Sequence, residues 1–146
     1  MSKIIIGIDP DSKAHGIAVY RDGYLMSIHC MTLPQVYTMF YDFYRGEKDI
    51  TVHIEDVNAV SAAFNARDRK TNINVKLKMA QHIGMCKQSQ IELERLFDFL
   101  EVSVVKHKIS KMWKKDKAQF ELVTGWIGRS NEDTRSAAYF GWLGCK

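Results

Sequence analysis

Three carboxylates in this chain have the chemistry and the positions needed to hold divalent metal ions. Asp9 follows an apolar run that begins at Ile4. Glu55 follows Val52, His53 and Ile54 in a similar strand-like context, and Asp133 opens the last segment with helical spacing. Two Mg²⁺ ions about 4 Å apart, held by three or four carboxylates, can activate a water molecule and neutralise charge on an attacked phosphate. Strand ends and a helix start can bring distant residues together, so these acids predict a metal site for phosphodiester hydrolysis.

Each of the three acids also has a purely structural explanation. Asp9 precedes Pro10 and could organise an Asx-turn, and a surface carboxylate at a strand end, such as Glu55, is common. Asp133 lies three residues after Ser130, so these two residues could form a capping box. Capping and metal ligation are compatible, and the joint occurrence of the three acids in this order favours the metal site.

The elements that must position these acids alternate between short β-branched runs and helical repeats. We expect strands over residues 3–9, 15–20, 24–30, 50–55 and 102–105. We expect helices between Pro34 and Gly46, over about 73–100, up to Gly125, and from Ser130 onward, with a loop over 57–71. This order predicts an α/β fold with a five-stranded mixed sheet and helices on both faces.

Length and composition favour one domain over residues 1–146. No apolar stretch approaches the roughly 20 residues that span a bilayer, and the N-terminus lacks the zones of a signal peptide. Three widely separated cysteines predict a reducing compartment, so we expect a cytoplasmic protein that does not bind membranes. The chain has no P-loop, no GxGxxG and no zinc-ligand spacing, so we expect no small-molecule cofactor besides metal.

Positive charge is concentrated in two segments, residues 67–78 and 106–117. Together they hold eleven basic and two acidic residues, a net charge of +9, whereas the rest of the chain carries −5. Lysine runs are often only solvated surface, but two such segments beside a carboxylate group favour a bound nucleic acid. Phe64, alone in a polar loop, could pack locally or could stack at a distorted base pair. The candidate DNA-binding residues are Phe64, Arg67, Arg69, Lys70, Lys76, Lys108, Lys114 and Lys115.

At these acids the sequence resembles the RuvC-like Holliday junction resolvases of the ribonuclease H superfamily, particularly the short phage and poxvirus type. The resemblance rests on three motifs, at residues 7–12, 54–57 and 132–138, and the order of elements matches over nearly the whole chain. It implies a ribonuclease H-like fold and a magnesium-dependent endonuclease that resolves four-way and other branched DNA, in a bacterial or phage-infected cell. It also implies two Mg²⁺ ions per active site, with Mn²⁺ as a substitute.

The resemblance also implies roles for individual residues. Lys108, Lys111, Lys114 and Lys115 lie where the family places basic residues that are catalytic or contact DNA. Of these four, Lys111 is the candidate for a catalytic role. The family usually has a second aspartate three residues beyond the one that matches Asp133, but here that position is Ser136. Either Glu132 or another acidic residue supplies the additional ligand, or water fills the site, or the protein is altered or less active. The family's usual glycine is replaced by Asp11, so the turn after Asp9 must differ.

Other functions remain open at this point. The chain could be a ribonuclease H-like enzyme that processes RNA, or a junction-binding protein without catalysis, which Ser136 would favour. An actin-like phosphate-binding domain has a similar first strand–turn–strand but normally needs two such domains. We also expect a homodimer through the helix over 73–100, whose apolar stripe runs from Met79 to Leu100; alternatively, that stripe packs only on its own sheet.

Overall fold

The computed structural model describes residues 2–59, 72–108 and 112–146 of the chain. Its elements are, in chain order, β1 (Ile4–Asp9), β2 (His15–Arg21), β3 (Tyr24–Met31), α1 (Leu33–Phe43), β4 (Ile50–Glu55), the 3₁₀ helix η1 (Val57–Ala59), α2 (Ile73–Phe99), β5 (Ser103–His107), α3 (Lys117–Thr124) and α4 (Glu132–Cys145). Phe64, Arg67, Arg69, Lys70 and Lys111, predicted above as functional residues, lie outside the described residues.

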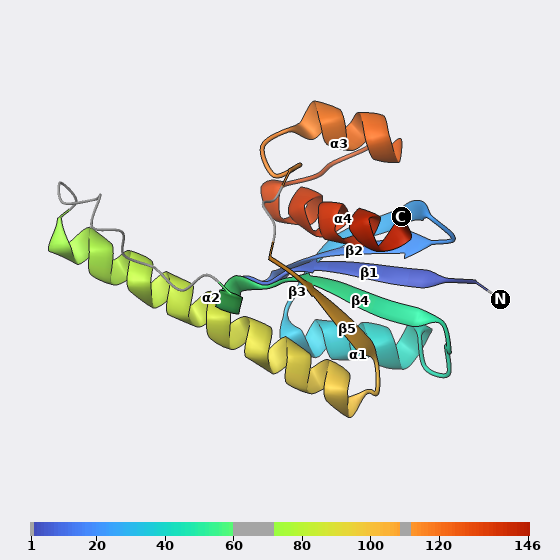
Figure 1. Cartoon of the computed structure of the whole chain (residues 1–146), viewed down its shortest axis with the longest axis horizontal. Helices are drawn as coiled ribbons and strands as arrows, with labels where there is room; N and C mark the ends of the chain where they lie inside the picture. Colours follow the sequence, from blue (N-terminus) through green and yellow to red (C-terminus); the bar gives the residue numbers. More distant parts are fainter. Residues whose placement is uncertain (1, 60–71, 109–111) are drawn as a thin grey trace.

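Five strands form one mixed sheet in the order β3-β2-β1-β4-β5 (Figure 1). β1, β2 and β3 are antiparallel neighbours, whereas β4 runs parallel to β1 and β5 runs parallel to β4. The β2–β3 hairpin turns at Asp22 and Gly23, whose positive φ angles of 51° and 86° match a type I′ turn. The predicted α/β class, with a five-stranded mixed sheet and helices on both faces, is confirmed.

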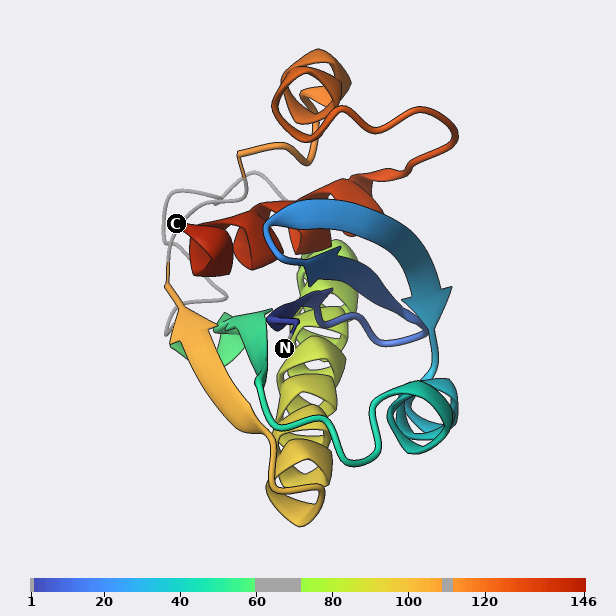
Figure 2. The same ribbon diagram turned by 90° about the vertical axis from the view of Figure 1, so that its right-hand side faces the viewer.

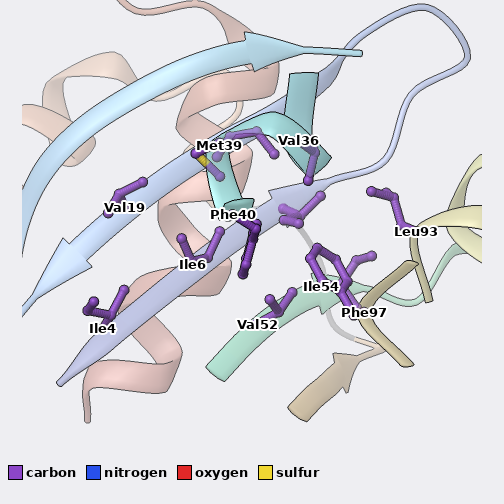
Figure 3. Close-up of a cluster of buried hydrophobic side chains, with 12 residues drawn as sticks. Ile4, Ile6, Val19, Val36, Met39, Phe40, Val52, Ile54, Leu93 and Phe97 are labelled. Carbon is purple, nitrogen blue, oxygen red and sulfur yellow. The ribbon is translucent and has the colours of Figure 1, made fainter. Parts of the chain in front are cut away.

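One face of the sheet is covered by α1 and α2. Every second side chain of a strand points to the same face, so Ile4, Ile6 and Ile8 of β1 lie on one face together with Val52 and Ile54 of β4 (Figure 3). The buried residues that α1 and α2 contribute to this core are Val36, Met39, Phe40, Leu93 and Phe97.

The opposite face is covered by α4, which lies unusually close to the strands (Figure 2). Glycine in β1 makes this approach possible: a Cβ on Gly7 would lie 2.0 Å from the backbone carbonyl oxygen of Ala137. Further along, Tyr20 of β2 donates a hydrogen bond of 2.6 Å to the carbonyl oxygen of Ala138. The helix is therefore fixed against β1 and β2 by both shape and a buried polar contact.

The start of α4 is capped by other residues than the sequence predicted. The side chain of Asn131 accepts a hydrogen bond from the backbone N–H of Thr134, and the Thr134 hydroxyl accepts one from the backbone N–H of Asn131. The capping box is therefore built by Asn131 and Thr134. The alternative prediction, a capping box of Ser130 with Asp133, is wrong. The side chain of Asp133 is not needed to cap the helix.

The other boundaries agree with the sequence to within a few residues. β5 occupies residues 103–107 rather than 102–105, because its pairing with β4 continues until His107 lies opposite Glu55. Residues 57–59, predicted as loop, form η1. Among the residues that the structure describes, no helix is both long and apolar enough to cross a membrane.

Candidate active site

The strand register places Asp9 and Glu55 side by side. Ile8 pairs with Ile54 across the parallel strands β1 and β4. Asp9 and Glu55 are the next residues, and each is the last residue of its strand. The backbones of adjacent strands are about 5 Å apart. Both acids also point to the same face. Gly7 contacts α4, so Asp9, two residues later, points towards α4 as well.

The same alternation holds in β4. A Cβ on Gly144 of α4 would lie 2.4 Å from the ring nitrogen Nε2 of His53, so His53 faces α4. Glu55, two residues further, faces α4 too. The carboxyl ends of β1 and β4 therefore present two acids on the face of the sheet that α4 covers.

Asp133 is placed at this end of the sheet by Gly16. Gly16 is the partner of Asp9 in the antiparallel pairing of β1 with β2. A Cβ on Gly16 would lie 2.2 Å from the carbonyl oxygen of Asp133 and 3.2 Å from its Cβ. Asp133 thus stands directly over the residue that pairs with Asp9, so the three predicted acids lie at the same end of the neighbouring strands β2, β1 and β4.

The burial of these acids suits a metal site. Asp9 is only 2% exposed, and Glu55 and Asp133 are half-buried. Several carboxylates gathered away from water repel one another, and a divalent cation offsets that repulsion. Oxygen donors grouped in this way match the preference of Mg²⁺. The donor set therefore fits the metal that the sequence implies. Glu132, also predicted as a ligand, is exposed in the first turn of α4.

Ser136 lies one helical turn after Asp133 and is completely buried. It belongs to the stripe of α4 that faces β4 and β5, because Phe140 stacks on His107 and Gly144 packs against His53. Within the described part of the chain, its hydroxyl oxygen has no hydrogen-bond partner. The position is therefore polar, enclosed and directed towards the β4 side of the acidic end.

A histidine pair lies beneath α4, next to the acids. Nδ1 of His53 and Nε2 of His107 are 2.8 Å apart, so one ring donates a hydrogen bond to the other. Burial, followed by the neighbouring His107 and Lys3, lowers the pKa of His53 to about 4. The pKa of His107 is also lowered, by burial. At neutral pH the pair is therefore uncharged and joins β4 to β5 without adding positive charge beside Glu55.

The described part of the second basic segment is anchored to α4. Trp113 is buried among Phe120, Tyr139 and Trp142. The guanidinium of Arg135, two residues after Asp133, donates hydrogen bonds of 2.9 and 3.3 Å to the carbonyl oxygen of Lys114. These contacts hold half-buried Lys114 and its exposed neighbour Lys115 against the helix that carries Asp133, and Lys108 is exposed.

The first basic segment is described only from residue 72 onward, in α2. Lys76 is half-buried there. Gln90, further along α2, was not predicted as a site residue, but it is fully buried and connects to the segment after Glu55. Its side chain accepts a hydrogen bond from the backbone N–H of Asn58 and donates one to Asp56. One signal for this role was present in the sequence: the side-chain amide of Gln90 interrupts the apolar stripe of α2.

Gly16 and Arg135 were also missed from the sequence. Their contributions depend on where α4 rests on the sheet, and no local spacing encodes that contact. For Gly16 the only available signal was a glycine inside an apolar strand, which often marks a close backbone approach.

Comparison of the sequence with models of known protein families finds no match, and neither does comparison with curated proteins. The fold is similar to that of a solved structure, T. thermophilus RuvC in complex with a Holliday junction substrate. The TM-score is 0.57 with 15% sequence identity, and the match covers 95% of this chain and 90% of that one. The chain therefore has the ribonuclease H-like fold of RuvC.

Proposed function

We propose that this protein is a divalent-metal-dependent endonuclease that resolves four-way and other branched DNA junctions. The observation that supports the proposal is that Asp9, Glu55 and Asp133 lie at the same end of three neighbouring strands in a sheet with the fold of RuvC. The solved neighbour is RuvC in complex with a Holliday junction substrate, which supports branched DNA as the substrate class.

In this proposal the three acids hold two Mg²⁺ ions, for which Mn²⁺ can substitute, with Glu132 as a candidate further ligand. The metal would supply an activated water and offset charge on the phosphate. The chain's own contribution is rigid placement: Asp9 and Glu55 are fixed by strand pairing, and Asp133 is fixed by the close packing of α4 on Gly16. Lys111 remains the candidate for stabilising charge that develops on the scissile phosphate.

Basic residues near the acidic end would bind the DNA backbone. The backbone at Lys114 is anchored to α4 by Arg135 and by the buried ring of Trp113, so Lys114 and Lys115 are carried on a segment held against the helix that begins with Glu132 and Asp133. We propose phosphate contacts for these two residues and for Lys76 and Lys108, which determine affinity more than sequence preference. Stacking by Phe64 and phosphate contacts by Arg67, Arg69 and Lys70 remain predictions from the sequence.

We also propose that the protein acts as a homodimer, so that two symmetric sites cut both strands of a junction. Helix α2 extends well beyond the edge of the sheet (Figure 1). Its C-terminal half buries Leu93 and Phe97 in the chain's own core. For that half, the alternative prediction that the stripe packs on its own sheet is confirmed. Its N-terminal half instead exposes a set of large apolar side chains, namely Ile73, Val75, Leu77 and Met79. The proposed dimer contact is therefore restricted to the N-terminal half.

A cleavage assay tests the proposed activity. The substrates are synthetic four-way junctions, linear duplex DNA and structured RNA, each with and without Mg²⁺. We expect Mg²⁺-dependent paired nicks in the junction and little cleavage of the other two. Preferred cleavage of RNA would contradict the proposed substrate and favour an RNA-processing enzyme.

Asp9→Asn separates catalysis from binding. The amide keeps the shape of the carboxylate but lacks the charge that metal binding requires, so cleavage should fall by at least about 100-fold. Junction binding in a gel shift should be unchanged or tighter, since repulsion between carboxylate and phosphate is relieved. Asp42→Asn is the matched control, because Asp42 is exposed on α1 at the opposite face of the sheet. Full cleavage by the Asp9→Asn protein would exclude this metal site.

If wild-type protein binds junctions tightly but cleaves nothing at any Mg²⁺ concentration, the junction-binding alternative replaces the enzyme. One observation favours this second function. Position 136 holds a buried serine, where the resemblance leads us to expect an aspartate.

A further inference from the structure

Three potential metal-binding groups of different chemistry meet between α2 and the loop that joins β1 to β2. His82 and Cys86 lie four residues apart on α2 and therefore on one face of the helix. Asp11 approaches them from the loop. Its carboxylate oxygen Oδ1 is 3.8 Å from Sγ of Cys86, and that sulfur is 3.6 Å from Nε2 of His82. One donor atom from each of the three residues lies within 4.8 Å of the other two.

The loop side of this cluster is held in place by hydrogen bonds. Oδ1 of Asp11 accepts a hydrogen bond of 2.8 Å from the backbone N–H of Ser12. The backbone N–H of Asp11 donates one of 3.2 Å to Nδ1 of His15, a buried residue in the first position of β2. The carboxylate is thus oriented towards α2 by contacts that do not involve the other two donors.

Two of the three distances between donor atoms match the coordination sphere of zinc. With Zn–S near 2.3 Å and Zn–N or Zn–O near 2.0 Å, two ligand atoms at a tetrahedral angle are roughly 3.5 Å apart. The sulfur–nitrogen and sulfur–oxygen distances of 3.6 and 3.8 Å are close to this value. A thiolate, an imidazole and a carboxylate are also a donor set that selects zinc-like ions over Mg²⁺, which prefers oxygen alone.

We propose that Asp11, His82 and Cys86 form a binding site for Zn²⁺ or a similar transition-metal ion, with water as the fourth ligand. The site is separate from the carboxylate centre, since its three donors include none of Asp9, Glu55 and Asp133. It is also close to that centre along the chain, because Asp11 follows Asp9 by two residues. A bound ion would join the middle of α2 to the loop that follows Asp9.

The first test uses Co²⁺ as a spectroscopic substitute for zinc on the full chain under reducing conditions. We expect one equivalent of Co²⁺ to give thiolate-to-cobalt charge-transfer absorption, which Zn²⁺ then displaces. Cys86→Ser should abolish this absorption. Cys30→Ser and Cys145→Ser are matched controls that should retain it, because those two cysteines are not part of the cluster.

His82 provides a variant with little risk to folding, because its side chain is exposed on α2. His82→Gln should weaken Co²⁺ binding by roughly tenfold or more, as loss of a ligand requires. For wild-type protein, Zn²⁺ at 100 times its Kd should raise Tm by roughly 5–10 °C, and His82→Gln should lose most of that rise at the same concentration.

A third variant distinguishes this site from the carboxylate centre. Asp9→Asn should retain the charge-transfer absorption, and excess Mg²⁺ should not displace the cobalt. The proposal is overturned if no charge-transfer absorption appears, if it persists in Cys86→Ser, or if His82→Gln binds as wild type does. Loss of the absorption in Asp9→Asn, with the fold intact by circular dichroism, would also overturn it by assigning the ion to the carboxylate centre. None of these readouts depends on nuclease activity.

Discussion

Ser136 is the residue at which this chain departs most clearly from the motif it resembles. Its hydroxyl is fully buried on the stripe of α4 that faces β4, one turn from Asp133. A neutral hydroxyl is a weaker ligand for Mg²⁺ than a carboxylate, so the proposed centre has fewer negative charges than four carboxylates would give. We therefore expect serine at this position to change the metal requirement of the proposed centre more than it changes the fold.

Ser136→Asp should therefore raise cleavage activity or lower the Mg²⁺ concentration needed for half-maximal rate. Without metal, the added buried charge should lower the free energy of unfolding by roughly 1–3 kcal/mol, and Mg²⁺ should restore much of that loss. Cleavage rates and urea unfolding across a Mg²⁺ titration measure both effects. Ser136→Asn, which has the same shape without the charge, is the control and should not lower the Mg²⁺ requirement. An unchanged Mg²⁺ dependence in Ser136→Asp would show that position 136 does not face the metal.

The three acids could be predicted individually because each follows or begins a recognisable local pattern. Asp9 and Glu55 come after apolar runs that are too short for helices, and Asp133 begins a helical repeat. The contacts that bring the acids together could not be predicted this way. Arg135 binds a backbone carbonyl 21 residues away, and such a contact leaves no spacing signal in the sequence.

At the scale of elements, the packing of α4 on β1 and β2 controls the position of Asp133. A Cβ on Gly16 would overlap the carbonyl oxygen of Asp133, a backbone atom that cannot move without the helix. Gly16→Ala should cost roughly 1–3 kcal/mol of unfolding free energy and shift the start of α4. A displacement near 1 Å in a catalytic group can cost about 100-fold in rate, so cleavage should fall far more than stability suggests.

Gly84→Ala is the matched control for that variant. A Cβ on Gly84 meets nothing within 4 Å, and alanine in a helix is favoured over glycine by roughly 0.5–1 kcal/mol. It should therefore stabilise α2 without reducing cleavage. Thermal unfolding and single-turnover cleavage for the two variants make the comparison. Wild-type cleavage by Gly16→Ala would mean that the position of α4 is not critical for activity.

The strands were predictable from the sequence because they are β-branched, short and bounded by turn residues, and Asp22 with Gly23 indicated the hairpin. α2 was predicted correctly in extent but not in the use of its stripe. Gln90 interrupts the stripe and proves to be a buried hydrogen-bonding residue, whereas Met79 at the other end is largely exposed. Hydrophobic periodicity gives the face of a helix, but it does not give how far along its length that face is covered.

At the scale of the whole molecule, the sequence separates its charge: residues 67–78 and 106–117 carry +9, and the rest of the chain carries −5. Replacing Lys108, Lys114 and Lys115 together with glutamine should weaken junction binding and flatten its dependence on salt. The log–log slope falls by roughly one unit for each phosphate that the protein no longer neutralises, so a change of up to about three units is expected. Lys48→Gln is the control, because Lys48 lies before β4, at the opposite end of that strand from Glu55. Binding measured over a salt series would show an unchanged slope if these lysines do not contact phosphates.

The N-terminal half of α2, which projects beyond the sheet, is the proposed contact of a symmetric dimer. Ile73 and Leu77 are 68% and 60% exposed and lie one helical turn apart, so they form an exposed apolar pair on one face of α2, the kind of surface that can mark an interaction site. Leu77→Glu should place a charge in the proposed contact and convert a dimer to a monomer in sedimentation at micromolar concentration. Paired nicking should then give way to single nicks, because each junction is held by one active site at a time. Leu122→Glu is the control, since Leu122 is 80% exposed on α3 and should leave the dimer intact. A wild-type chain that sediments as a monomer at high micromolar concentration would remove the dimer, and the two strands of a junction would then have to be cut in separate binding events.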